Sequence, residues 1–272
     1  MFYVIINIMV KRTNMRKFIK KFSKNLTKEN WKSILMALLA LVIVLTAVRG
    51  GLHLLDKYSV ASVTDDGIGY PIRGVDVSHY QGTVDWHQLK KQGISFAFIK
   101  ATEGTTFVDD KFKENWRKAH RAHIKRGAYH FYHFEDDPIM QAKHFTKVVP
   151  KKKDALPPVI DFETYGKYVN SPPPEAETVE NLRIFMSIIE DKYDRVPIIY
   201  CNRYCYSKYI SGNFDNPIWL ADPSMSPALP DGRQWEFLQY SFYGVLEGYD
   251  GIKHIDLDLF WGSKKDYWEK YY

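Results

Sequence analysis

The chain has 272 residues, of which 45% are hydrophobic and 26% are charged, so it can build a packed core and is not a disordered polymer. Its two Cys exclude a disulfide-stapled scaffold and a cysteine zinc domain. Nine of the 38 Lys and Arg lie in residues 1–32 with one acid, Glu29, and the other 240 residues hold 29 basic and 31 acidic side chains. The basic excess is therefore an N-terminal arm, and we expect no nucleic-acid binding by the folded part.

An uncharged apolar segment follows this arm, from Ser33 to Val48, between Lys32 and Arg49. As a helix it would be ~24 Å long against a hydrocarbon core of ~30 Å, and the flanking cations can snorkel to the interface. We predict a transmembrane signal-anchor over 33–49. A cleaved signal peptide is the main alternative and a buried soluble helix the second. Met15, which opens MRKFIKK, is a plausible alternative start.

The positive-inside rule places residues 1–32 in the cytoplasm as a basic arm and the rest beyond the bacterial cytoplasmic membrane. Residues 50–70 contain four Gly and little periodicity, which predicts a linker. The folded, extracytoplasmic domain is then 71–272. Its two Cys, Cys201 and Cys205, are too close in sequence to brace a fold, so we interpret them as structural or free thiols, with a strained bridge as the alternative.

Short apolar runs alternate with helical patterns from residue 74 onward. Eight runs are typical of buried strands: 74–78, 94–101, 127–134, 157–163, 196–202, 217–221, 237–241 and 254–260. Amphipathic stretches cover 85–92, 110–125, 137–149 and 175–193, and one short helix is expected near 203–210. This order predicts an α/β fold, a parallel (β/α) barrel that is irregular because the last strands lack full helices. A doubly wound open sheet is the alternative, and no nucleotide-binding Gly-rich loop is present.

Acids fall at the ends of these predicted strands, where a barrel of this kind carries its chemistry. Asp161 and Glu163 are two apart, so a strand would point both carboxylates to one face, and burial beside each other would raise their pKa. Closing the barrel would add Asp76 from the first strand and Asp256 from the last. A general acid kept protonated near neutral pH requires such a setting.

Other interpretations of these acids are strand-end caps, partners of Lys or Arg, or a divalent metal site with oxygen ligands. Nothing resembles a cation-binding loop, and we predict no metal and no cofactor. His130 and His133 should point to opposite faces of one strand, and His120 and His123 should lie at a surface or in packing.

The aromatic content of 15% is high, and several aromatic side chains lie near strand ends. Aromatic faces stack on sugar rings, and phenol or amide groups bind sugar hydroxyls, although core packing is the simpler interpretation of each one alone. Together with paired acids they favour a glycosidase. The candidate sugar-binding residues are Tyr129, Phe131, Tyr200, Trp219, Gln239 and Tyr240.

A family resemblance rests on motifs that run in order from about residue 72 to 262. The most specific are GVDVSHYQGTVDW (74–86) and PPVIDFE (157–163), followed by FIKATEG, RGAYHFYHF, IIYCN, WLA, LQYS and IDLDLF. The sequence resembles glycoside hydrolase family 25, the Chalaropsis-type lysozymes. The resemblance implies a flattened, irregular β/α barrel with eight strands and fewer helices.

The same resemblance implies a muramidase that cleaves the β-1,4 bond between N-acetylmuramic acid and N-acetylglucosamine in peptidoglycan. It makes Glu163 the proton donor, Asp161 its partner at the N-acetyl group or the oxocarbenium-like transition state, and Asp76 and Asp256 the other pocket acids. Tyr129 matches a sugar-contacting aromatic.

Three positions depart from the family pattern. The family often has Trp at the position of Leu238, and Trp235 is the candidate to replace it. The family often has A-x-Y where this chain has Ala221-Asp222-Pro223. It often has Asn at the position of Asp258. These departures concern fine substrate preference.

We therefore predict a membrane-tethered peptidoglycan hydrolase whose catalytic domain is monomeric. Two alternatives remain at the level of sequence: a catalytically silent peptidoglycan-binding module, and a hydrolase of another N-acetylated glycan such as chitin. Retention or inversion at the anomeric carbon depends on the spacing of the carboxyl groups.

Overall fold

A computed structural model describes residues 39–40, 44, 46, 70–224 and 227–272. The chain divides into two units, Met1–Ser62 and Val63–Tyr272, and the fold described below belongs to the second. Within the described residues, no helix has the length and apolar character needed to cross a membrane. The predicted basic arm (1–32), most of the predicted anchor (33–49) and nearly all of the predicted linker (50–70) lie outside the described residues.

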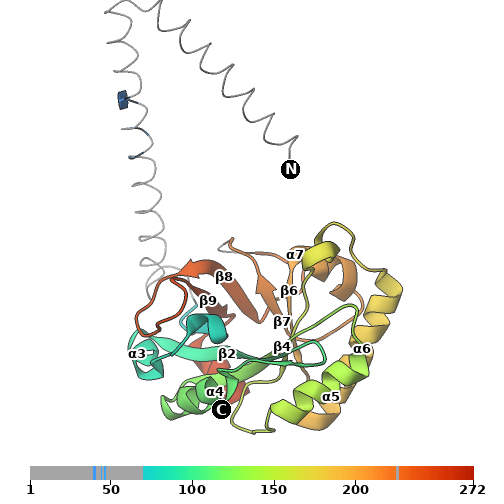
Figure 1. Cartoon of the computed structure of the whole chain (residues 1–272), viewed down its shortest axis with the longest axis horizontal. Helices are drawn as coiled ribbons and strands as arrows, with labels where there is room; N and C mark the ends of the chain where they lie inside the picture. Colours follow the sequence, from blue (N-terminus) through green and yellow to red (C-terminus); the bar gives the residue numbers. More distant parts are fainter. Residues whose placement is uncertain (1–38, 41–43, 45, 47–69, 225–226) are drawn as a thin grey trace, which may run out of the picture. The chain divides into compact units, whose positions relative to one another are not determined.

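The second unit is a closed barrel of eight strands. Its strands follow the order β1-β9-β8-β7-β6-β5-β4-β2, and β1 also pairs with β2, which closes the ring. The helices α3, α4, α5 and α6 lie around the outside of the strands (Figure 1). This closure confirms the predicted barrel and excludes the open doubly wound sheet. The eight strands are β1 (Arg73–Val77), β2 (Ile94–Glu103), β4 (Lys125–Phe131), β5 (Val159–Asp161), β6 (Ile198–Asn202), β7 (Ile218–Ala221), β8 (Phe237–Gly244) and β9 (Ile255–Phe260).

The prediction of an entirely parallel barrel was wrong for the last strand. β9 runs antiparallel to both β8 and β1, whereas the remaining barrel pairs are parallel. The reason is the connection: only ten residues separate β8 from β9 and they form no helix, so the chain turns back at the same end of the barrel instead of crossing over. A two-residue strand, β3 (Phe107–Val108), pairs with the end of β2 outside the ring.

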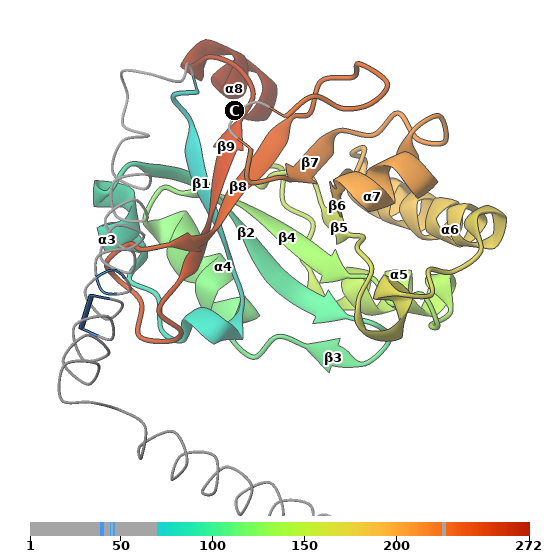
Figure 2. The same cartoon turned by 90° about the horizontal axis from the view of Figure 1, so that it is seen from above.

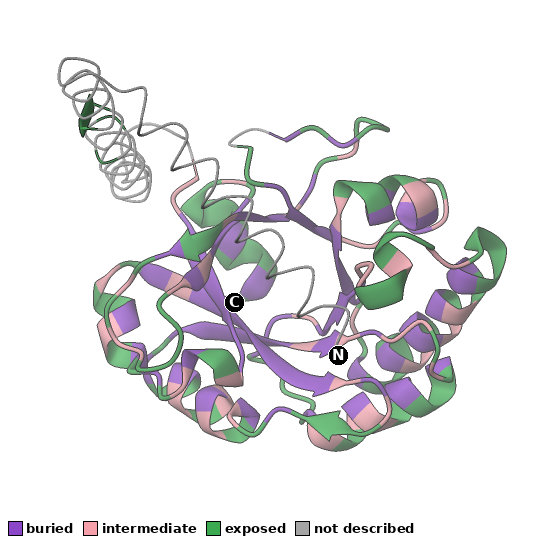
Figure 3. Cartoon of the chain, turned by 45° about the horizontal axis from the view of Figure 1, so that its top comes forward, coloured by how far each residue is buried: buried purple, intermediate pink, exposed green. Residues whose placement is uncertain are grey.

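Helices fill the early crossovers, as the amphipathic stretches predicted. The strands are buried along most of their length, and the helices are buried on one side only (Figure 3). Asp85 caps the first helix by accepting from the amides of His87 and Gln88, and Asp137 caps another before Pro138. The main helices are α3 (Trp86–Lys91), α4 (Phe112–Arg121), α5 (Pro138–Val148), α6 (Glu175–Tyr193) and α8 (Lys264–Tyr271).

Shorter helical turns occupy the loops at the strand ends. After β6 only α7 (Arg203–Cys205) and a π-helical turn, η3 (Tyr206–Ile210), precede β7, which matches the single short helix expected there. Two 3₁₀ turns, η1 (His79–Gln81) and η2 (Gly166–Val169), follow β1 and β5.

Apolar side chains fill the barrel interior from the end where the parallel strands begin to its middle. Phe96 and Phe98 of β2 belong to one buried cluster with Trp219, Phe237 and Phe260, and Tyr267 and Tyr271 of α8 complete it. The helix α8 lies at the end where the parallel strands begin (Figure 2). Large rings fit there because two strand positions are Gly: a Cβ on Gly74 would lie 2.3 Å from the Phe96 ring, and one on Gly127 would lie 2.7 Å from the Phe98 ring. The acidic side chains occupy the opposite end of this interior.

Candidate active site

Four predicted acids are brought to the end of the barrel where the parallel strands finish. Asp76 on β1 lies directly opposite Asp256 on β9 in the strand register. Asp161 ends β5, and Glu163 follows two residues later, just beyond the strand. Asp76 and Asp161 are each 8% exposed, whereas Glu163 and Asp256 are only partly buried. The two less buried carboxyl groups therefore remain accessible to a ligand.

Burial is the main cause of the raised pKa values in this cluster. It raises the pKa of Asp161, and the neighbouring Glu163 carboxylate adds to the shift. It also raises the pKa of Glu163, with a further contribution from Asp256. The pKa of Asp76 is raised well above its usual value by burial and by Asp256, and burial raises that of Asp256 to about 6. Such carboxyl groups hold protons at pH values where exposed acids are ionised.

A hydrogen-bonded chain fixes the two acids of β1 and β9. The Tyr200 hydroxyl donates to Gln239 Oε1 at 2.8 Å. Gln239 Nε2 in turn donates to Asp76 Oδ2 at 2.7 Å and, more weakly, to Asp256 Oδ2 at 3.4 Å. Tyr200 and Gln239 were both expected to bind sugar, and here they orient the acids.

A buried cation, Lys100 on β2, stands beside the acids and was not singled out from the sequence. It is 9% exposed, and its charge lowers the pKa of both Asp161 and Glu163 against the effect of burial. Its Nζ donates to Glu103 Oε2 at 2.6 Å, and Glu103 Oε1 lies 3.1 Å from His133 Nε2. The signal for Lys100 was a lysine inside an otherwise apolar strand run.

The predicted sugar-binding aromatics divide into two groups. Tyr129 and Phe131 belong to the acidic end: the pKa of the Tyr129 phenol is raised by burial and then by Asp76 and Asp161, and Phe131 is paired in register with Asp161. The Phe131 ring also lies 5.0 Å from Lys100 Nζ. Both side chains are partly exposed, so both can meet a substrate.

Trp219 and Tyr240 are placed differently from the expectation. Trp219 is 2% exposed, packs 4.3 Å from the Phe98 ring, and donates from Nε1 to Asp258 Oδ1 at 2.9 Å. Its ring faces are therefore covered by the core. Tyr240 lies where the register of β8 and β9 shifts. Burial raises the pKa of its phenol, and the charge of Arg73 partly opposes this.

Trp235, the suggested replacement aromatic, is also buried. It packs between Tyr70 and Trp261 at the opposite end of the barrel.

Two carboxylate oxygens in the cluster are buried without a hydrogen-bond partner. They are Oδ1 of Asp161 and Oδ2 of Asp258. Asp258 is fully buried beneath Asp256, and burial raises its pKa well above the usual value. An unpartnered buried carboxylate oxygen is costly unless it carries a proton or meets a donor. The raised pKa of Asp161 is consistent with this cost.

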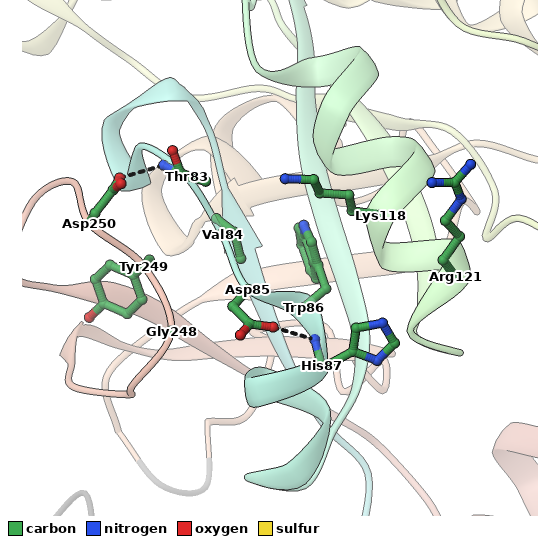
Figure 4. A pocket seen from close by; sticks show the side chains of 10 residues that line it. All are labelled: Thr83, Val84, Asp85, Trp86, His87, Lys118, Arg121, Gly248, Tyr249 and Asp250. Carbon is green, nitrogen blue, oxygen red and sulfur yellow. Dashed lines mark hydrogen bonds between the residues drawn. The ribbon is translucent and has the colours of Figure 1, made fainter.

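A separate pocket of about 580 Å³ lies beside α3 and α4 and is lined by none of the four acids (Figure 4). Its two carboxylates are used in local structure. Asp85 caps α3, and Asp250 accepts from the Thr83 amide at 2.6 Å. This pocket has no acid free for general acid–base work.

The remaining candidate groups have structural surroundings. Cys201 and Cys205 are free, buried thiols, and burial raises the pKa of both. His130 on β4 is fully buried, burial lowers its pKa to about 3, and its Nε2 lies 3.1 Å from Gln141 Oε1. The prediction that His133 shares this strand was wrong, because β4 ends at Phe131. His120 and His123 are exposed. In the described part of the chain, no group of three or more His, Cys, Asp or Glu could hold a metal ion.

A barrel that gathers carboxyl groups of raised pKa at one end has the arrangement of a glycoside hydrolase. Residues 75–249 match the family model for glycosyl hydrolases family 25. A solved family 25 glycosyl hydrolase from Bacillus anthracis is 41% identical, with a TM-score of 0.72, and the match covers 76% of this chain and 96% of that chain.

Two curated proteins extend the comparison. Lysozyme M1 of Streptomyces globisporus is 32% identical over 213 residues, which cover 71% of this chain and 68% of that protein. The N,O-diacetylmuramidase of Chalaropsis sp is 28% identical over 183 residues, which cover 61% of this chain and 85% of that protein. The chain belongs to glycosyl hydrolase family 25, and it is a glycoside hydrolase of the lysozyme type.

The raised pKa of Asp256 predicts how folding stability depends on pH. An unfolded Asp loses its proton near pH 3.9, whereas Asp256 in the fold does so at about 6. The folded state therefore binds this proton more tightly, and its loss between pH 4 and 6 lowers stability. Asp256→Asn should reduce that fall, so that at pH 7 the variant is more stable than the wild type by about 1–2 kcal/mol.

Urea unfolding at pH 4 and pH 7, followed by circular dichroism, measures this difference. Asp191→Asn on the exposed side of α6 is the matched control and should keep the wild-type dependence. An equal fall in stability for Asp256→Asn and the wild type would contradict the assigned pKa.

Proposed function

We propose that the protein is a muramidase that cleaves the β-1,4 bond between N-acetylmuramic acid and N-acetylglucosamine in peptidoglycan, with Glu163 as the general acid. The observation that carries this proposal is the position of Glu163 next to Asp161 at the end of β5. Burial and Asp256 raise its pKa while its carboxyl group stays partly exposed. A protonated, accessible carboxyl group can donate a proton to the leaving glycosidic oxygen. The lysozyme and muramidase names of two relatives support the choice of substrate.

Asp161 is proposed to act at the anomeric carbon of the glycosidic bond, whereas Glu163 acts at the leaving oxygen. Its carboxyl group, which is 8% exposed at the end of β5, can accept from the N–H of a substrate N-acetyl group, which would position the acetyl oxygen near the anomeric carbon. Its carboxylate can equally stabilise positive charge there. Lys100 supports the ionised form because its charge lowers the pKa of Asp161.

Asp76 and Asp256 are proposed to set the pKa of Glu163 and to hold water, with Gln239 and Tyr200 fixing their orientation. Tyr129 and Phe131 are proposed to contact sugar. For Trp219 and Tyr240 we propose support of the strand ends instead, because Trp219 holds Asp258 and Tyr240 lies near Arg73.

We further propose that the catalytic domain is monomeric and is held on the outer side of the cytoplasmic membrane by the apolar segment 33–49. The support is the pattern of charge. Nine cations lie in residues 1–32, and the apolar residues 33–48 that come next carry no charge. An enzyme tethered in this way would act on the cell's own wall.

Glu163→Gln should lower glycan cleavage by about 10²- to 10⁴-fold, because the amide cannot donate the proton and keeps the shape of the side chain. The assay incubates the full chain in a nonionic detergent with purified peptidoglycan and identifies the new reducing ends by mass spectrometry. Glu190→Gln on the exposed side of α6 is the matched control. Near wild-type turnover by a folded Glu163→Gln protein would refute the assignment.

The same assay separates the competing functions. Reducing-end N-acetylmuramic acid from the wild type supports the muramidase, and reducing-end N-acetylglucosamine would mean that another bond is cut. Wall binding without new ends would favour a binding module. Cleavage of chitin oligosaccharides but not of peptidoglycan would favour another N-acetylated glycan.

Lys100→Met should move the pH–rate profile to higher pH. The lysine charge lowers the pKa of Asp161 and of Glu163, so its loss raises both values and shifts both limbs upward by about 0.5–1 pH unit. Lys147→Met, on an exposed part of α5, is the control. A lower rate with unchanged limbs would show that Lys100 only packs against Glu103 and Phe131.

If the segment 33–49 is an anchor, the full chain should remain in the membrane fraction after alkaline carbonate washing. A variant in which Leu38, Leu39 and Leu41 are replaced by Asp should be released. Immunoblotting of the fractions measures both. Release of the unmodified chain by carbonate would contradict the anchor.

A further inference from the structure

A basic pocket lies at the end of the barrel opposite to the acids. Its volume is about 720 Å³, and the C-terminal ends of α3 and α4, the start of β4, the segment before β5 and the helix α8 line it. Five of the lining residues are cationic, namely Lys90, Arg121, Lys125, Arg126 and Lys153, and one, Asp154, is acidic. We call this cavity and its lining residues the basic pocket.

The single acid of the basic pocket is already engaged. Asp154 Oδ2 lies 3.2 Å from Arg126 Nη1 and 3.3 Å from His120 Nδ1. The chain beyond residue 32 carries slightly more acids than bases, so this excess of positive charge is local. Local cationic excess in a hollow raises the concentration of anions there.

Lys125 is the most informative residue of the pocket. It is 6% exposed, and its Nζ lies 4.0 Å from the centre of the Tyr272 ring. No carboxylate of the described residues is within ion-pair distance of it. Burial is the main cause that lowers its pKa; the charges of Arg195 and Arg126 also lower it, and the charge of Asp154 opposes them. A buried ammonium without a carboxylate is costly, and a bound anion would offset that cost.

The neighbouring Arg126 gives an independent indication. It is 4% exposed, and its Nε has no hydrogen-bond partner. A guanidinium group usually places all its donors on carboxylate, phosphate, carbonyl or water oxygens. Arg126 also stacks on the Trp116 ring at 4.7 Å and pairs with Asp154. Lys125 therefore has binding capacity that the described protein groups do not use, and Arg126 adds a second buried positive charge beside it.

The chemistry of the pocket fits phosphate. Several converging cations favour an anion with more than one charge and several acceptor oxygens, as in a phosphate ester. Trp268 and Tyr272, which are 47% and 62% exposed, border the pocket and can cover the apolar or polyol remainder of such a molecule. The basic pocket is separate from the acidic end of the barrel, because β4 leads from Lys125 to Phe131, seven residues or about 20 Å along the barrel.

We propose that the basic pocket binds a phosphate ester, either on an anionic lipid headgroup or on a phosphate-containing polymer, and so holds the barrel with its acidic end directed away from the phosphate. This site is distinct from the glycan site, and its test does not depend on hydrolase activity.

Isothermal titration of the full chain in a nonionic detergent tests the proposal with sn-glycerol 1-phosphate, and with acetate as the anion without phosphate. We expect saturable binding of glycerol phosphate and none of acetate at the same concentration. Lys125→Met, which keeps the buried stem, should weaken binding at least about tenfold, because a hydrogen bond to a charged group is lost.

Arg121→Gln is the second variant, since Arg121 is exposed and its replacement leaves the core intact. It should weaken binding by about three- to tenfold. Lys113→Gln, an exposed position at the other end of α4, removes one charge without touching the pocket and should bind as the wild type does. No binding of glycerol phosphate, or equal affinity in all four proteins, overturns the proposal.

Two further probes identify the source of the phosphate. Dihexanoylphosphatidylglycerol presents a lipid headgroup, and a short poly(glycerol phosphate) presents a polymer. The probe that binds more tightly than glycerol phosphate, with the same loss in Lys125→Met, identifies the class of ligand. If both probes bind as well in Lys125→Met as in the wild type, they bind elsewhere and the pocket is not their site.

Discussion

The double pairing of β1 is the constraint on which the molecule depends. This strand bonds in parallel to β2 and antiparallel to β9, and so joins the beginning of the folded domain to its last strand. The register of the second pairing sets Asp76 opposite Asp256. Without closure these two residues, 180 positions apart, would lie on opposite edges of a sheet, and the acidic cluster would not exist.

The closed barrel also separates two electrostatic environments. Its interior is aromatic and apolar from the α8 end to the level of Trp219, and acidic beyond that level. Burying several carboxyl groups above an apolar layer raises their pKa, and Lys100 partly counteracts this. The outcome is a graded set of acids: Asp258 is deepest, Asp76 and Asp161 are nearly covered, and Glu163 and Asp256 are the most accessible. Such a gradient allows neighbouring carboxyl groups to carry different charges at one pH.

Much of this arrangement could be predicted from the sequence, because it depends on local patterns. Each of the eight apolar runs contains a strand, and Asp161 and Glu163 do lie at one site, although β5 ends at Asp161 and Glu163 follows beyond the strand. What failed depends on the third dimension. The direction of β9 follows from a short connection, and the depth of Trp219 follows from its level within the barrel, which an alternating pattern does not reveal. Lys100 was overlooked because a lysine in a strand is ordinarily read as a surface residue, and only closure shows that its side chain points inward.

The antiparallel course of β9 has a practical consequence. Because the last strand runs back along the barrel, Tyr70, which packs on Trp261, and Tyr272, which covers Lys125, both lie at the end remote from the acids. Either end of the domain can then carry a fused reporter, an affinity handle or a surface linkage without obstructing the approach of a polymer as bulky as a cell wall. The protein can thus be immobilised in a defined orientation on a sensor chip or bead while its glycan-facing end stays open.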